Sequence, residues 1–111
     1  AITLDPEMSL LEACKKLSDS KVRAALVGKN GDPKGLISME DVIRGVAEGK
    51  EDRPVEESME REYPTVDADD PLHVAISELG RTGACQVVVL DSNVPTGMLG
   101  ATELIRCMIR F

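Results

Sequence analysis

The feature that most restricts the fold of this 111-residue chain is an internal repeat at a constant offset of 62 positions. The offset holds without a gap, and the identical pairs fall where strands, turns and helices are expected. These pairs are Thr3/Thr65, Asp5/Asp67, Leu10/Leu72, Ala13/Ala75, Leu17/Leu79, Val27/Val89, Pro33/Pro95, Gly35/Gly97, Ile43/Ile105 and Arg44/Arg106. The sequence therefore predicts two copies of one folding motif.

Each copy is too short to be stable alone, because halves of about 50 residues bury too little surface. We therefore expect the two copies to share a core and to pack about an intramolecular pseudo-twofold axis. The expected boundaries are residues 1–49 for the first repeat, 50–62 for a linker and 63–111 for the second repeat. The linker is predicted from its polar composition with Gly and Pro. The chain starts without Met at a residue that already resembles a strand, which suggests an excised domain or an incomplete N-terminus.

Apolar periodicity and turn residues predict the order β-α-β-β-α within each repeat, and hence an α+β fold. In the first repeat we expect a strand at residues 2–4, followed by a helix that ends near Leu17. Strands over 22–27 and 34–37 then lead to a helix from Met39 to about Glu48. A short exposed helix is expected over 54–61.

The junction between the last strand and the last helix carries the main candidate site. An apolar run leads into Ser38, a natural helix N-cap, and Asp41 falls where its carboxylate can bond back to the cap. The same pair suits a nucleoside, because a carboxylate beside free helix N–H groups can accept the hydroxyls of a cis-diol. Spacing alone leaves both interpretations open: a structural capping box or a ligand site.

Composition excludes several classes of function. A net charge of −7 with 2% aromatic residues supplies neither the basic stripe nor the stacking platforms of a nucleic-acid binder. The longest apolar run, Val87–Leu90, is too short to cross a bilayer, and without a charged-then-apolar leader pattern secretion is not expected. Cys14, Cys85 and Cys107 lack the spacing of a disulfide framework. We expect them to be reduced, buried apolar residues of a cytoplasmic protein.

Catalysis is not expected either. A nucleophile needs an adjacent base, and the single histidine, His73, lies in the other repeat from Ser38. With one histidine and no Cys-x-x-Cys pair, a zinc site is not expected. The chain is therefore predicted to bind rather than to catalyse, with no resident cofactor.

The duplicated β-α-β-β-α pattern, the corner Gly35-Leu36-Ile37-Ser38-x-x-Asp41 and the link Pro54–Met59 before Thr65 resemble a tandem of cystathionine β-synthase (CBS) domains, a Bateman module. The resemblance covers essentially the whole chain. It implies that an adenosine-containing ligand (AMP, ADP, ATP or S-adenosylmethionine) binds in the cleft between the repeats and regulates an attached or partner protein. It also implies homodimers that pair through their helices. A ferredoxin-like sensor, allowed by strand order alone, fits the gapless repeat less well.

The resemblance also implies roles for individual residues. Ser38 and Asp41 would bind the ribose and Arg23 a phosphate, and the other repeat would contact the adenine through Pro64, Thr65, Ala84 and Cys85. A second, weaker or vacant site would comprise Glu103, Gly100, Thr3 and Val22. It departs from the family pattern because glycine replaces the hydroxyl residue and glutamate replaces aspartate. Cys85 also occupies the position that Arg23 has in the first repeat.

The acidic charge favours AMP or S-adenosylmethionine over ATP, because three phosphates would meet net repulsion. The alternative function is a ligand-free pair of CBS domains that acts as a dimerisation module.

Overall fold

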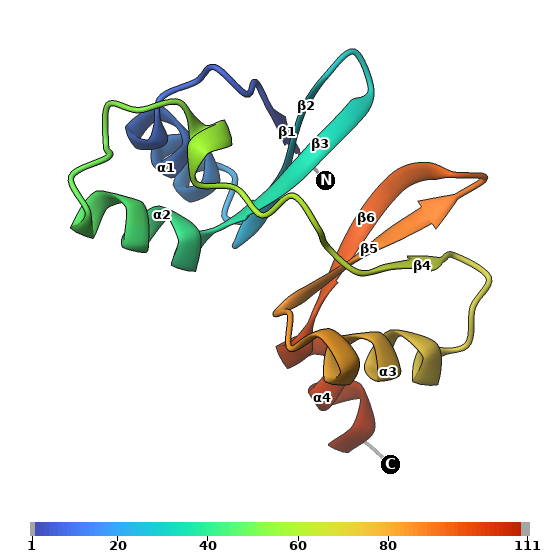
Figure 1. The fold of residues 1–111 in the computed structure, drawn as a ribbon. Helices are drawn as coiled ribbons and strands as arrows, with labels where there is room; N and C mark the ends of the chain where they lie inside the picture. The colour runs from blue at the N-terminus through green and yellow to red at the C-terminus, as the bar shows by residue number, and fades with distance from the viewer. Residues whose placement is uncertain (1, 110–111) are drawn as a thin grey trace. The chain divides into compact units, whose positions relative to one another are not determined.

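The computed structural model describes residues 2–109, except for the side chains of Cys107 and Met108. Two compact units divide the chain, Ala1–Glu62 and Tyr63–Phe111. Each unit contains a three-stranded sheet, and two helices cover one face of it (Figure 1). The predicted α+β class with two similar repeats is confirmed. The finer division into residues 1–49, 50–62 and 63–111 stays a prediction.

The first unit has the predicted order of elements. It comprises β1 (Thr3–Leu4), α1 (Leu10–Asp19), β2 (Ala24–Lys29), β3 (Asp32–Ser38), α2 (Met39–Ala47) and a 3-10 turn, η1 (Val55–Glu57). The central strand β2 pairs in parallel with β1 and antiparallel with β3. β1 and β3 are therefore the two edge strands of this sheet.

The second unit repeats this arrangement at the offset that the sequence shows. It comprises β4 (Thr65–Asp67), α3 (Leu72–Thr82), β5 (Gln86–Asp91), β6 (Val94–Gly100) and α4 (Ala101–Ile109). Val27 pairs with Gly35 and Val89 with Gly97, and each β2–β3 or β5–β6 ladder shifts register at the next residue. The internal duplication therefore extends to the strand register.

Both hairpins turn through two residues with positive φ, which suits the twist of the strands that they join. The first turn uses Asn30 and Gly31, with φ of 54° and 75°. The second uses Ser92 and Asn93, with φ of 51° and 66°. Since non-glycine residues disfavour this conformation, the second hairpin has the less favourable turn.

The segment that follows α2 is part of the first unit. We call residues 51–60 the strap. The backbone carbonyls of Arg53 and Glu51 accept the N–H groups of Leu10 and Leu11, each at 3.0 Å, so the strap satisfies two free donors in the first turn of α1. At its other end, Glu60 pairs with Leu36 on the outer edge of β3.

Two apolar side chains of the strap complete the core of the first unit. Val55 and Met59 are buried and pack in one cluster with residues of the sheet and the helices. The expected exposed helix over 54–61 is therefore wrong in two respects. The helical turn is limited to η1. Val55 points into the core because burial of this apolar side chain against the sheet and helices is favourable. The cluster comprises Leu4, Leu10, Ala13, Leu17, Ala25, Val27, Ile37, Val42, Val55 and Met59.

The second unit has a smaller core of the same aliphatic kind. Its buried cluster consists of Val66, Ala75, Leu79, Val87 and Leu104. The counterparts of the fully buried Val27 and Ile37 are Val89 and Leu99, which are only partly buried. No residue of the strap belongs to this cluster.

Candidate functional site

The strand–helix corner of the first unit is held by a reciprocal capping box. The Ser38 hydroxyl accepts the Asp41 N–H at 3.1 Å, and the Asp41 carboxylate accepts the Ser38 N–H at 3.0 Å. This geometry confirms Ser38 as the N-cap of α2. Both residues are buried, with exposed fractions of 7% and 4%.

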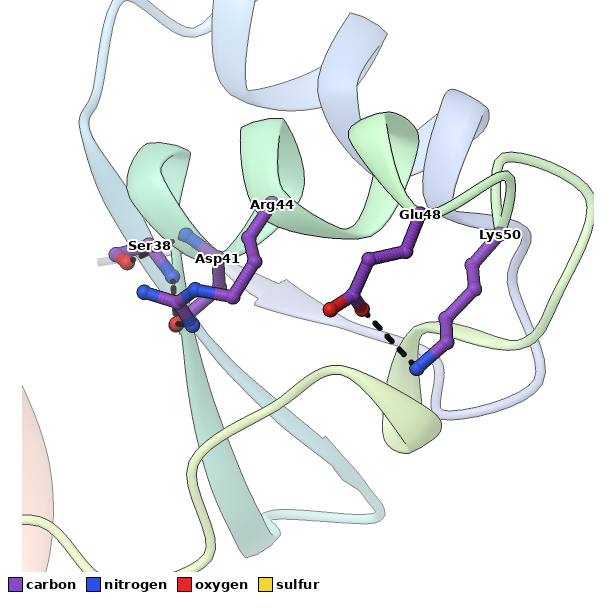
Figure 2. A network of polar contacts seen from close by, with 5 residues as sticks. All are labelled: Ser38, Asp41, Arg44, Glu48 and Lys50. Atoms are coloured by element: carbon purple, nitrogen blue, oxygen red, sulfur yellow. Dashed lines mark hydrogen bonds and ion pairs between the residues drawn. The ribbon is translucent and has the colours of Figure 1, made fainter.

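A third residue neutralises the buried carboxylate. Arg44, one turn further along α2, donates from its guanidinium to Asp41 Oδ1 at 3.1 Å (Figure 2). The i,i+3 spacing of these residues is the signal that sequence analysis missed. At the other end of the helix, Glu48 and Lys50 form a separate ion pair of 3.2 Å that does not reach the corner.

The corner retains capacity to bind a ligand. A carboxylate offers about four acceptor positions. Asp41 Oδ2 accepts the Ser38 N–H, Asp41 Oδ1 accepts from Arg44, and the Asp41 carboxyl shares a further hydrogen bond with the Glu60 carboxyl. The backbone and Arg44 thus supply hydrogen-bond donors that a buried carboxyl group needs. A hydroxyl group of a cis-diol is a suitable donor for the remaining position, and the Ser38 O–H group can itself donate.

Arg23 lies beside the same corner. Its backbone carbonyl accepts the Met39 N–H at 2.9 Å. Its exposed guanidinium donates to Glu40 Oε1 at 3.2 Å. A hydrogen bond from its own backbone N–H lowers the pKa of Glu40, against the effect of desolvation, and Arg23 lowers it further. The expected phosphate-binding cation is therefore already paired with a carboxylate.

The strap adds a third acidic group to the corner, which sequence analysis did not find. Desolvation raises the pKa of the Glu60 carboxyl, and its charge repulsion and hydrogen bond with Asp41 raise it further, against the lowering effect of Arg44. Glu40 contributes in the same raising direction. The corner thus places three carboxyl groups near two guanidinium groups.

The second corner differs in its packing as well as in its residues. A Cβ atom placed on Gly100 would lie 2.5 Å from Glu103 Oε2 and 3.1 Å from the Gln86 side-chain nitrogen. The longer glutamate therefore occupies the space that a serine side chain would need. The Cys85 carbonyl accepts the Ala101 N–H at 2.9 Å, as that of Arg23 does in the first unit.

The other predicted residues lie at the starts of strands. Pro64 is buried, and its carbonyl accepts the Val88 N–H at 2.9 Å, whereas Thr65 is exposed on β4. Ala84 is half-buried and Cys85 is exposed just before β5. In the first unit, Thr3 is exposed and Val22 half-buried. Because two units contribute these residues, their approach to Ser38 and Asp41 stays a prediction.

The expected burial of all three cysteines is wrong for Cys85, because it precedes the strand at an exposed position. Cys14 is half-buried against the first core. The side chain of Cys107 lies outside the described residues.

The second unit contains an apolar hollow of ≈ 350 Å³. It lies between α3 and α4, and Ala84 and Ala101 contribute to its wall. The full lining comprises Ile76, Leu79, Gly80, Gly83, Ala84, Ala101, Leu104 and Ile105. Such a wall suits an apolar group better than a phosphate.

Residues 2–109 lack two features that would point to other functions. None of the helices there has the length and apolar character needed to traverse a bilayer. Within the same residues, histidine, cysteine, aspartate and glutamate side chains do not gather in threes as metal ligands would.

A duplicated β-α-β-β-α repeat with a buried Ser-x-x-Asp corner defines a class of tandem α+β modules. The family model of the CBS domain matches residues 1–48 and 55–110. The chain therefore belongs to the CBS-domain family.

One known protein is similar in sequence to most of this chain. The chain is 24% identical over 105 residues to the uncharacterized protein MJ1232 of Methanocaldococcus jannaschii. The matched region covers 94% of this chain and 35% of that protein. The chain thus spans about a third of the length of this relative.

Two solved CBS structures match nearly the whole chain. The CBS domain pair of protein MJ0100, in complex with 5′-methylthioadenosine and S-adenosyl-L-methionine, is 26% identical with a TM-score of 0.85, and the match covers 98% of this chain and 88% of that one. The CBS domain protein PAE2072 from Pyrobaculum aerophilum, complexed with AMP, is 23% identical with a TM-score of 0.79, over 97% and 91% of the two chains.

Proposed function

We propose that this chain is a regulatory module that binds an adenosine-containing ligand at the Ser38–Asp41 corner and controls an attached or partner protein, in the cytoplasm. The observation that carries the proposal is the buried Ser38–Asp41 pair at the start of α2, where Asp41 keeps about one acceptor position beyond its bonds to Ser38, Arg44 and Glu60. The ribose hydroxyls would bind there, and Pro64, Thr65, Ala84 and Cys85 would contact the base. The ligand complex of MJ0100 supports this chemistry by similarity.

The charges at the corner favour a ligand with few phosphates. Arg23 is paired with Glu40, and Arg44 is paired with Asp41. Glu60 adds a further carboxyl group. A triphosphate would bring several negative charges to a place where both cations already have partners. 5′-Methylthioadenosine, S-adenosylmethionine or AMP therefore fits this corner better than ATP.

Isothermal titration calorimetry with 5′-methylthioadenosine, S-adenosylmethionine, AMP and ATP tests the proposal. The decisive variant is Asp41→Asn, because an amide oxygen keeps the cap on the Ser38 N–H but removes the charge and part of the acceptor capacity. We expect it to weaken binding at least about tenfold, since hydrogen bonds to charged groups contribute about 1.5–3 kcal/mol. The matched control is Glu103→Gln at the second corner, which should leave the tight site unchanged. Equal affinity of Asp41→Asn and the parent chain would refute the ribose role.

The alternative is a dimerisation module that binds no small molecule, and one observation favours it. Repeat-related isoleucines on α2 and α4 are exposed, Ile43 at 64% and Ile105 at 54%. Val46 and Ile109 extend the exposed apolar surface of the two helices. Sedimentation of the parent chain and of Ile43→Glu/Ile105→Glu tests this alternative. A dimer that the double variant abolishes and that no adenosine ligand affects would support it.

A further inference from the structure

The strap brings one carboxyl group to the buried corner. Glu60 is held there by its backbone, because it exchanges two hydrogen bonds of 2.8 Å with Leu36, two residues before Ser38. The strand edge admits this approach at Gly35, where a Cβ atom would lie 2.8 Å from the Glu60 carbonyl oxygen. The Glu60 residue is exposed. Its side chain can therefore turn away from the corner while the backbone of the strap stays in place.

The Glu60 carboxyl group shares a hydrogen bond with the carboxyl group of Asp41. Two carboxyl groups can form such a bond only with a proton between them, because an ionised carboxylate has no donor. Asp41 has an exposed fraction of 4%, which limits competition by water for this bond. Desolvation and the charge of Asp41 raise the pKa of Glu60 in the same sense. The Glu60–Asp41 bond therefore carries one exchangeable proton.

The two cations of the corner each have another carboxylate partner. Arg44 donates to Asp41 at 3.1 Å, and Arg23 donates to Glu40 at 3.2 Å. Arg44 lowers the pKa of Glu60 and Glu40 raises it, but desolvation and Asp41 have the larger effects. Asp41 is therefore the side chain that most strongly governs the protonation of Glu60. Exposed charged residues near this contact in the sequence are Lys34 on β3, and Arg61 and Glu62 after the strap.

A diol that binds to Asp41 competes with Glu60. Asp41 keeps about one acceptor position beyond its bonds to Ser38, Arg44 and Glu60 (Figure 2). A ligand that places both hydroxyls of a cis-diol on Asp41 therefore needs a position that is already taken. Glu60 is the partner that can leave, because the Ser38 N–H belongs to the capping box and Arg44 is bound by charge.

We propose that Glu60 regulates this site by a proton-linked exchange, in which a ribose hydroxyl takes the place of Glu60 on Asp41 and one proton leaves to solvent. The inference rests on the proposed function and adds the regulation of the same site. One hydrogen bond to Asp41 replaces another, and the released Glu60 side chain becomes a hydrated carboxylate. Because the complex holds one proton fewer, affinity for the diol rises with pH through the titration of Glu60.

Calorimetric titration with 5′-methylthioadenosine from about pH 5 to about pH 8 tests the inference, because this ligand has the diol but no phosphate. We expect its affinity to rise about threefold or more, the effect of one hydrogen bond. Buffers of different ionisation enthalpy should reveal proton release. The 2′-deoxy derivative of this ligand keeps one ring hydroxyl, which needs only the remaining acceptor position. Its affinity should not depend on pH.

Two substitutions of Glu60 separate its titration from that of Asp41. Glu60→Gln supplies a permanent N–H donor to Asp41, so binding of the diol should stay weak at every pH. Glu60→Ala removes the competing donor, so binding at about pH 5 should be as tight as that of the parent chain at about pH 8. Glu62→Gln, at an exposed position just beyond the strap, should keep the pH profile of the parent chain. Thermal midpoints verify that each variant is folded.

Three outcomes would overturn the inference. The first is an affinity of the parent chain that does not change with pH. The second is a Glu60→Ala variant that keeps the rise with pH, which would assign the proton to Asp41 alone. The third is equal affinity of Glu60→Gln and Glu60→Ala at about pH 8. Failure of the proposed function looks different, because then none of the adenosine ligands binds at any pH, and the inference falls with it.

Discussion

Leu36 and Glu60 exchange two backbone hydrogen bonds, each 2.8 Å long, although α2 separates them in the sequence. These bonds fasten the strap to the outer edge of β3 and carry the Glu60 carboxyl group to the buried Asp41. The electrostatics of the corner therefore depend on a residue outside the strand and helix that build it.

Glu60→Gln should stabilise the chain near neutral pH. Because the folded state raises the pKa of Glu60, the group favours folding below its unfolded pKa, and this contribution is lost as the pH rises through the folded pKa. Where Glu60 is ionised, the variant removes a negative charge that Asp41 repels. We expect a gain of a few tenths of a kcal/mol, since the residue is largely solvated.

Urea unfolding at pH 7 and pH 4 measures this effect. The gain should disappear as the pH falls below about 4.3, the ordinary pKa of glutamate. A variant that is less stable than the parent at pH 7 would contradict the repulsion. Glu62→Gln, at an exposed position just beyond the strap, is the control for loss of one negative charge.

Gly35→Ala and Gly97→Ala should differ in stability although they occupy equivalent positions. The first places a methyl group against Met59 and the Glu60 carbonyl, whereas the second meets open space. Overpacking of this kind costs about 1–3 kcal/mol. Gly97→Ala should change the free energy of unfolding by less than about 0.5 kcal/mol. Differential scanning calorimetry of both variants measures the difference. Equal thermal midpoints would show that the strap leaves room for a methyl group at residue 35.

Ser38→Ala should destabilise the chain more than Ser9→Ala. Both serines cap a helix, since the Ser9 hydroxyl accepts the Glu12 N–H at 3.1 Å and the Ser38 hydroxyl accepts the Asp41 N–H at the same distance. Loss of an ordinary cap costs about 1 kcal/mol. At Ser38 the released N–H group is also buried, which adds a desolvation penalty of about 1–3 kcal/mol.

Urea unfolding of the two alanine variants gives this comparison directly. An equal loss for Ser9→Ala and Ser38→Ala would mean that water reaches the released Asp41 N–H group.

Glu40→Gln should increase the preference for a phosphorylated ligand. The substitution releases Arg23 from its ion pair of 3.2 Å and removes one negative charge beside the corner. We expect AMP to bind about threefold more tightly, in line with the small energies of exposed ion pairs. Affinity for 5′-methylthioadenosine, which has no phosphate, should not change.

Calorimetric titration of both ligands checks the Glu40→Gln prediction. Glu78→Gln breaks an acid–arginine pair of the same type in α3 and serves as the control. Equal gains for AMP and for 5′-methylthioadenosine would indicate a general charge effect and not a phosphate contact.

The sequence predicts the parts of this fold that depend on local patterns. The gapless offset anticipates that β2 and β5 share a register, and Ser38 with Asp41 anticipates the capping box, because cap, turn and apolar period are all local signals. The sequence does not predict the roles of Arg44 and Glu60, because these roles depend on side-chain conformation and on tertiary pairing. Polar composition predicts an exposed helix over 54–61, yet Val55 and Met59 fill a space that only the folded sheet creates.

The strap also sets an order of events during synthesis of the chain. Residues 1–49 contain β1, α1, β2, β3 and α2 of the first unit. When only these residues have been synthesised, the core still lacks Val55 and Met59. Leu10 and the edge of β3 stay uncovered until ten further residues have emerged. By then β4, which begins at Thr65, follows within a few residues. The first unit thus reaches its final core only as the second repeat begins to appear.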